Sequence, residues 1–190
     1  ALTAHQLNEL ASECGEHSLI VLTAGMTGLR WGELAALQVK DISLLGRTIN
    51  VNKAVTLNLK GERVIGNTKT HQERVVPISR DLSLRLEKVI SGKSPDQSLF
   101  QMRDGGKLDY NNFMARVFRP AVKNVNLGAF TFHQLRHTTA SLLISQGTPI
   151  TAVSAILGHA STQMTLNVYG HLYEGDAIKY VDRLSESLFS

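Results

Sequence analysis

The hydrophobic period of the chain changes twice, and these changes restrict the folds open to it. Over residues 42–78, three short β-branched runs, "RTINVNKAV", "ERVIG" and "ERVVPI", are interrupted by Gly and Asn, which predicts a small antiparallel sheet. Before and after this stretch, apolar residues recur at helical spacing. The expected fold class is therefore mainly α with one small antiparallel β-sheet, an α+β architecture.

The helices are expected where apolar stripes lie between capping residues and glycines. Thr3 and Gln6 form a capping-box pair at the first helix, "SLIVLTAGMTG" predicts a second, and a third begins near Trp31. Further helices are expected over residues 80–91, 109–124, 131–146, 149–157, 161–168 and 175–188. Caps are predicted at Asp109, Thr131 and Ser161, and breaks at Gly92, Gly128, Gly147 and Gly158.

The size of the chain predicts one compact domain. Its 190 residues, 43% of them hydrophobic, can build one well-packed core but not two full domains. No apolar run approaches the roughly 20 residues that cross a bilayer, and "ALTAHQLNEL" lacks the features of a signal peptide. Cys14 is the single cysteine, expected to be a small buried residue, and it cannot form an internal disulfide. We therefore expect a soluble, cytoplasmic protein.

The charge of the chain is unevenly distributed. The net charge of +4 divides into −3 over residues 1–46, +9 over residues 47–136 and −2 over residues 137–190. A basic zone between mildly acidic ends is expected where one face meets a polyanion such as nucleic acid. A solvated surface explains the same pattern nearly as well, so charge alone leaves both interpretations open.

The segment "HQLRH" at residues 133–137 raises the question of a metal site. A helical zinc hydrolase needs a carboxylate beside the first histidine, and here that position is Gln134, with no third ligand at a suitable spacing. The segment "GMTGLR" also lacks the length and the Lys-Ser/Thr ending of a phosphate-binding loop. We expect no metal ion, no other cofactor and no consumption of ATP.

Two arginines interrupt apolar segments. Arg30 precedes "WGELAAL", and Arg136 lies within "FHQLRHTTASLLI". A buried arginine must be paired or must face a cavity. Two converging guanidinium groups suit a phosphate, whose oxygens accept bidentate hydrogen bonds. Internal salt bridges, with Glu33 as the partner of Arg30, are an equally good explanation from the residues alone.

A family resemblance favours phosphate binding as the role of these two arginines. The segments "TAGMTGLRWGELAALQVKDI", "TKTHQERVVPI", "FHQLRHTTASLLISQG", "VSAILGHAS" and "TLNVYGH" follow one another in this order. Together they resemble the catalytic domain of the tyrosine recombinases, the phage integrase family. The resemblance spans almost the whole chain, so we expect the fold of a tyrosine recombinase catalytic domain. It implies six catalytic residues, which are Arg30, Lys69, His133, Arg136, His159 and the nucleophile Tyr169.

The resemblance implies a site-specific DNA recombinase that integrates or excises a phage or mobile element. A phenol attacks a DNA phosphodiester and leaves a 3′-phosphotyrosine, so the strand can be rejoined without ATP. Arg30, Arg136 and His159 would stabilise the charge on the non-bridging oxygens. His133 would handle the Tyr169 proton, and Lys69 would protonate the 5′-oxygen.

Other residues near this set receive lesser roles. Glu33 is interpreted as a support for Arg30, His171 as a supporting residue beside the nucleophile, and His137 as a packing residue or an indirect support. Tyr173 is the competing nucleophile. The apolar stripe of residues 175–188 is expected to pack on its own domain or on a neighbouring protomer.

The resemblance also implies partners and a domain organisation. The chain would form a single catalytic domain over residues 1–190, without the core-binding and arm-binding domains of the family. Its partners would be double-stranded DNA attachment sites, other protomers in a synaptic tetramer, a host DNA-bending protein and a directionality factor. Two alternatives remain: a type IB topoisomerase-like strand transferase, and a non-catalytic regulator that uses "ASLLISQGTPITAVSAILGHAS" as a helix-turn-helix.

Overall fold

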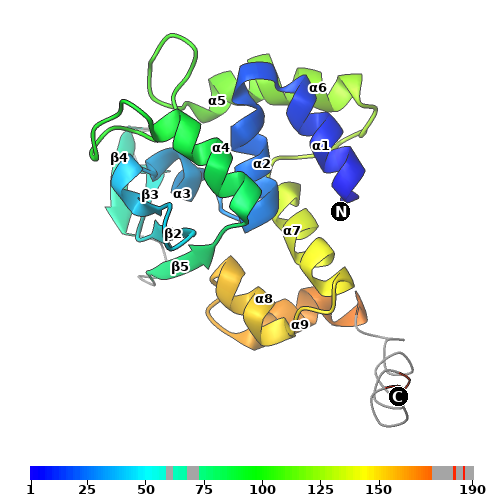
Figure 1. Cartoon of the computed structure of the whole chain (residues 1–190). Coiled ribbons are helices and arrows are strands. Elements are labelled where there is room, and N and C mark those ends of the chain that lie inside the picture. The colour runs from blue at the N-terminus through cyan, green and yellow to red at the C-terminus, as the bar shows by residue number, and fades with distance from the viewer. Residues whose placement is uncertain (59–61, 68–72, 173–181, 183–185, 187–190) are drawn as a thin grey trace.

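The computed structural model describes residues 1–58, 62–67, 73–172, 182 and 186, and it confirms the mainly α fold with small antiparallel sheets (Figure 1). Helices α1 (Ala4–Glu13), α2 (Ser18–Thr27) and α3 (Trp31–Ala36) lie at the start of the chain. The predicted capping box is present, because the Thr3 hydroxyl accepts from the Gln6 backbone N–H and the Gln6 side chain accepts from the Thr3 N–H. Helix α2 ends at Gly28, whose φ of 67° is left-handed and therefore suits glycine.

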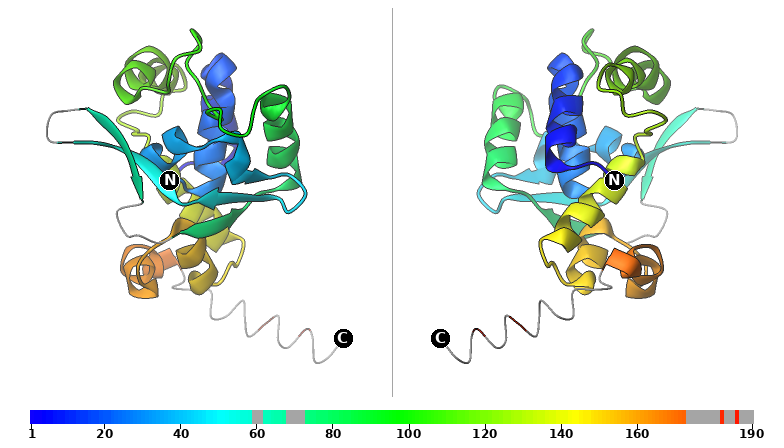
Figure 2. Two further views of the ribbon diagram at one scale, coloured as in Figure 1. Left: turned by 90° about the vertical axis from the view of Figure 1, so that its left-hand side faces the viewer. Right: turned by 90° about the vertical axis from the view of Figure 1, so that its right-hand side faces the viewer.

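The strands form two sheets where one was expected. Strands β1 (Ile42–Ser43), β2 (Thr48–Val51) and β5 (Arg74–Pro77) make an antiparallel sheet in the order β1-β2-β5, and Ile49 pairs with Val76. Among the described residues, strands β3 (Lys53–Leu57) and β4 (Arg63–Asn67) form a separate two-stranded antiparallel sheet. The expectation of one sheet was wrong because β1 and β5 already occupy both edges of β2. The β3–β4 hairpin instead lies against α3 and extends away from the helices (Figure 2).

The expected helix over residues 109–124 is divided into three segments. Asp109 caps α5 (Tyr110–Phe113) as predicted, and a π-helical stretch (Met114–Phe118) separates α5 from α6 (Arg119–Asn124). Pro120 lacks the N–H that a regular helix would direct at the carbonyl of Arg116, so the regular hydrogen-bond ladder is interrupted there. Helix α4 (Arg80–Ile90) packs against α2 and contributes Leu82 and Leu86 to the main core.

The last described helices form a separate layer around a small core. Helices α7 (Gln134–Ser145), α8 (Ile150–Leu157) and α9 (Thr162–Tyr169) lead into a 3₁₀ turn, η4 (Gly170–Leu172) (Figure 1). Helix α7 begins three residues after the predicted cap, and Gln134 Oε1 accepts from the Thr131 backbone N–H at 2.6 Å. The residues that form this second cluster are Ala140, Ile144, Val153, Leu157 and Tyr169.

Two further expectations concern the chain as a whole. None of the helices in the described ranges combines the length and the apolar character that a bilayer span requires. The helix expected over residues 175–188 lies outside the described residues, apart from residues 182 and 186.

Candidate active site

The structure brings Arg30 and Arg136 together across the interface of α2, α3 and α7. Arg136 is only 5% exposed, and its Nη1 donates to the carbonyl oxygen of Gly28 at 2.8 Å, two residues before Arg30. Burial, followed by the positive charge of Arg30, lowers the pKa of Arg136 to about 10. Within the described part of the chain, no acceptor reaches the buried Nη2 of Arg136. A buried guanidinium nitrogen without an acceptor is costly, and an anion bound at this point would satisfy it.

Glu33 holds Arg30 in place. Its Oε1 accepts from Arg30 Nη1 at 3.0 Å, and its Oε2 accepts from the Arg30 backbone N–H at 2.8 Å. The Glu33 side chain is 2% exposed, whereas that of Arg30 is 40% exposed and open to a large ligand. The predicted support by Glu33 is therefore present as a direct contact. Arg30 forms the salt bridge that the sequence offered as one alternative, but Arg136 has no carboxylate partner among the described residues.

Arg74 is part of this cluster, and the sequence analysis missed it. Its Nη1 and Nη2 donate to the two oxygens of Glu33 at 2.9 and 2.8 Å, and its Nε donates to the carbonyl of Ile156 at 3.1 Å. Burial alone would raise the pKa of Glu33, but the hydrogen bonds and charge of Arg74, and then those of Arg30, bring it below its usual value. The available signal was the alternation in β5, which places Arg74 on the same face as the buried Val76.

Arg74 also fixes the turn that carries His159. Gly158 ends α8 with a φ of 67°, and a Cβ there would lie 2.6 Å from Arg74 Cδ. His159 follows directly, with its Nδ1 2.7 Å from the Thr165 hydroxyl oxygen. Burial, then the charges of Arg136, Arg30 and Arg74, lower the pKa of His159 to about 4. The imidazole is therefore neutral at pH 7, and its Nε2 can donate if Nδ1 accepts from Thr165.

Substitution of Arg74 tests this bridge between α3 and α8. We expect Arg74→Lys to slow chemistry at this site by up to about 10²-fold, since a small misplacement of a reacting group has an effect of that order. A lysine keeps the charge but cannot form the bidentate contact with Glu33. Single-turnover cleavage of a nicked DNA site, measured beside the DNA dissociation constant, checks this. Arg63→Lys, at an exposed position in β4, is the matched control, and an unchanged rate for Arg74→Lys would show that Arg30 and Glu33 suffice.

Tyr169 lies at the end of α9 with its ring in the small core. It is 5% exposed, and its hydroxyl lies 2.6 Å from Nδ1 of His137. Burial raises the pKa of the Tyr169 phenol, while the charge of Arg136 opposes that rise. The sequence analysis had interpreted His137 as a packing residue or an indirect support and had given the Tyr169 proton to His133. In the structure, His137 is the histidine that contacts this hydroxyl.

His133 is the N-cap residue of α7, one turn before His137. It is exposed, and its ring meets that of His137 edge to face, with the ring centroids 5.3 Å apart. Burial, the positive charge of His137 when protonated, and the charges of Arg136 and Arg30 lower its pKa. Lys69 and Tyr173 lie outside the described residues. His171 is exposed in η4, and among the described residues no hydrogen bond or ion pair joins it to the arginines, the histidines or Tyr169. The supporting role of His171 stays a prediction.

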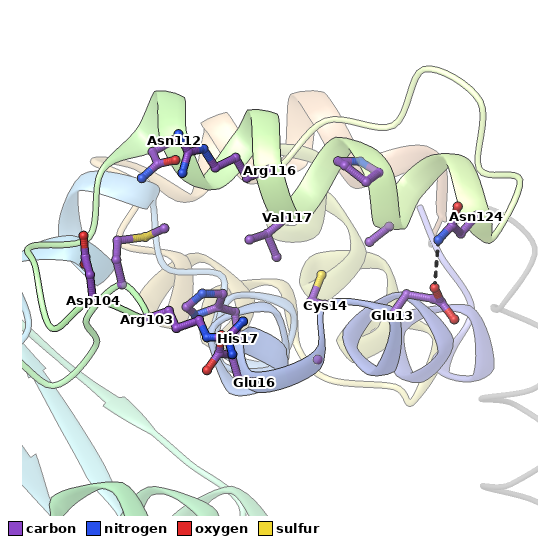
Figure 3. A pocket seen from close by; sticks show the side chains of 14 residues that line it. Glu13, Cys14, Glu16, His17, Arg103, Asp104, Asn112, Arg116, Val117 and Asn124 are labelled. Carbon is purple, nitrogen blue, oxygen red and sulfur yellow. Dashed lines mark hydrogen bonds and ion pairs between the residues drawn. The ribbon is translucent and has the colours of Figure 1, made fainter.

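A cavity of about 620 Å³ lies elsewhere, between η1 (Gly15–His17) and the α5–α6 region (Figure 3). Its lining includes Cys14, His17, Arg103 and Arg116, and none of the predicted site residues. Burial, and then the charge of Glu13, raise the pKa of Cys14 to about 12, so this thiol is not poised as a nucleophile. Groups of three or more His, Cys, Asp or Glu that could hold a metal ion are absent from the described ranges.

Comparison with known proteins places the site in a family. Residues 1–175 match the phage integrase family. The chain is 33% identical to the ICEBs1 integrase of Bacillus subtilis over 177 residues, which is 87% of this chain and 47% of that protein. It is 32% identical to transposase A from transposon Tn554 of Staphylococcus aureus, over 96% of this chain and 52% of that protein. The chain thus spans about half the length of these curated relatives.

Solved structures agree with the fold. The integrase of transposon Tn1549, solved in complex with circular intermediate DNA, superimposes with a TM-score of 0.79 at 26% identity, covering 96% of this chain and 66% of that one. The catalytic domain of bacteriophage HP1 integrase superimposes with a TM-score of 0.64 at 24% identity, covering 96% of this chain and 92% of that one. The second likeness shows the shared fold.

Proposed function

The chain belongs to the phage integrase family, and from this premise we propose that it is the catalytic domain of a site-specific DNA recombinase that cleaves and rejoins DNA through a 3′-phosphotyrosine. The observation that carries the proposal is the orphaned Nη2 of Arg136, buried beside Arg30 in the cluster that holds the Tyr169 hydroxyl. An anion-binding point beside a phenol suits a phosphodiester and a nucleophile.

The proposed reaction assigns one task to each residue. The Tyr169 oxygen loses its proton to a histidine of "HQLRH" and attacks the scissile phosphorus, and the bond from phosphorus to the 5′-oxygen breaks. Arg30 and Arg136 donate to the non-bridging oxygens, where charge develops in the transition state, and His159 donates a third hydrogen bond. His133 lies at the exposed side of the cluster, close enough to both arginines to join this phosphate site. Lys69 protonates the departing 5′-oxygen.

The proposed substrate is a double-stranded DNA attachment site of a phage or mobile element in the cytoplasm of a bacterial host. The relatives named integrase and transposase, and the DNA in the Tn1549 complexes, support this substrate. The proposed partners are other protomers in a synaptic tetramer, a host DNA-bending protein and a directionality factor. Stored bond energy in the phosphotyrosine allows rejoining to another end without ATP.

Covalent capture tests the proposal. The protein is incubated with a duplex that carries the attachment sequence at the end of its element, nicked so that the cleaved fragment with the free 5′-hydroxyl diffuses away. The expected product is a protein–DNA adduct that survives denaturation and whose linkage maps to Tyr169. DNA binding without any adduct would favour a non-catalytic DNA-binding protein and would refute the proposed reaction.

A further inference from the structure

The hydroxyl of the proposed nucleophile has a specific partner. Tyr169 on α9 and His137 on α7 are 32 residues apart in the chain, yet the Tyr169 oxygen lies 2.6 Å from His137 Nδ1. Their ring centroids are 5.7 Å apart. In the described ranges, His137 is the only hydrogen-bond partner of this hydroxyl. Such a short distance between a phenol oxygen and a ring nitrogen is within the range for direct proton transfer.

The Tyr169 side of this pair is buried. Tyr169 is 5% exposed and belongs to the small core that also contains Ala140, Ile144, Val153 and Leu157, and His137 is half-buried. An attack by the Tyr169 oxygen requires loss of its proton, and burial raises the pKa of this phenol. The proton therefore needs an acceptor within the protein, and Nδ1 of His137 already touches it.

The two histidines of "HQLRH" occupy different electrostatic positions. Burial comes first for both, and the charge of Arg136 lowers the pKa of both. His137 and Arg30 also lower the pKa of His133, whereas the amino group of Ala1 also lowers that of His137. His133 is exposed on the side of Arg30 and Arg136. His137 lies one helical turn further along the chain, and its ring contacts those of His133 and Tyr169. A neutral His137 with its proton on Nε2 leaves Nδ1 free to accept.

We propose that His137, and not His133, is the catalytic residue that accepts the proton of Tyr169 during strand cleavage. The assignment rests on the proposed function. As the Tyr169 oxygen bonds to phosphorus, its O–H bond breaks and the proton moves to His137 Nδ1. The bond from phosphorus to the 5′-oxygen breaks, and that oxygen takes a proton from Lys69. In rejoining, the 5′-hydroxyl returns its proton to Lys69 as its oxygen attacks phosphorus. The bond from phosphorus to the Tyr169 oxygen then breaks, and His137 returns its proton to that oxygen.

Single-turnover adduct formation on a nicked attachment-site duplex, at saturating DNA, tests this assignment. We expect His137→Ala to slow adduct formation by about 10²-fold or more, because a general base contributes 10²- to 10⁴-fold. The dissociation constant for DNA should change little. Added imidazole should restore much of the rate to His137→Ala, since it can occupy the space left and take the proton. His133→Ala is the matched control and should gain much less from imidazole.

Other outcomes would overturn the assignment. Adduct formation by His137→Ala at or above the normal rate would show that the hydrogen bond only restrains Tyr169. Imidazole rescue of His133→Ala but not of His137→Ala would give the proton to His133. His137→Asn fills the site and can hydrogen-bond to Tyr169 but cannot take its proton, so a normal rate for this variant would refute the proposal even if His137→Ala does not fold.

These results separate the assignment from the proposed function. If the unaltered protein forms no adduct at Tyr169, the proposed recombinase reaction itself fails. If the unaltered protein and His137→Ala form the same adduct at the same rate, the reaction stands and only the role of His137 is refuted.

Discussion

Tyr169→Phe is expected to abolish the covalent DNA adduct while leaving DNA binding nearly unchanged. The substitution removes the proposed nucleophilic oxygen and retains the ring that lies in the small core with Ile144 and Leu157. It also removes the hydrogen bond to His137, with an expected loss of about 0.5–1.5 kcal/mol in the free energy of unfolding. For a chain of this size, that loss lowers the melting temperature by only a few degrees.

Denaturing electrophoresis of a reaction with nicked attachment-site DNA measures the adduct, and a binding assay on the same DNA measures affinity. Tyr110→Phe is the control, because Tyr110 lies at the start of α5 and is about half exposed. An adduct of normal yield with Tyr169→Phe would move the nucleophile to another residue, with Tyr173 tested next. Loss of folding in Tyr169→Phe would contradict the expectation that its ring, and not its hydroxyl, supports the small core.

Arg136→Lys is expected to slow cleavage by on the order of 10²- to 10³-fold, the range seen when one donor to a developing oxyanion is lost. Arg136 uses Nη1 for the Gly28 carbonyl and leaves Nη2 for an anion. A lysine is a single point charge on a flexible stem, so it cannot hold both contacts in the geometry of the guanidinium group. The loss should therefore appear in the rate of the chemical step even at saturating DNA.

Rates of adduct formation, with melting temperatures measured on the same samples, check the Arg136 prediction. Arg119→Lys, at an exposed position on α6, controls for the general effect of replacing an arginine with a lysine. A near-normal rate for Arg136→Lys would make Arg136 a structural link between α7 and Gly28. A large drop in melting temperature with a normal rate per folded molecule would lead to the same conclusion.

The sequence alone determined the fold class and the residue types of the site. Helical and strand periods are set by neighbouring residues, so the change near residues 42–78 and the caps at Thr3 and Asp109 could be read directly. The ordered segments "HQLRH", "LGH" and "TLNVYGH" indicated a family whose members share this fold. The number of sheets was missed because pairing between strands is decided by which edges are free, and local sequence does not record that.

Only the tertiary structure decided which polar groups meet. From the residues alone, binding of a phosphate and internal salt bridges explained Arg30 and Arg136 equally well. In the fold, Glu33 pairs with Arg30, and Nη2 of Arg136 has no acceptor among the described residues. Arg74 lies 41 residues from Glu33, and His137 lies 32 residues from Tyr169. Contacts over such separations depend on where β5 enters its sheet and on how α7 and α9 pack, because long-range packing, and not residue spacing, sets the distance between these side chains.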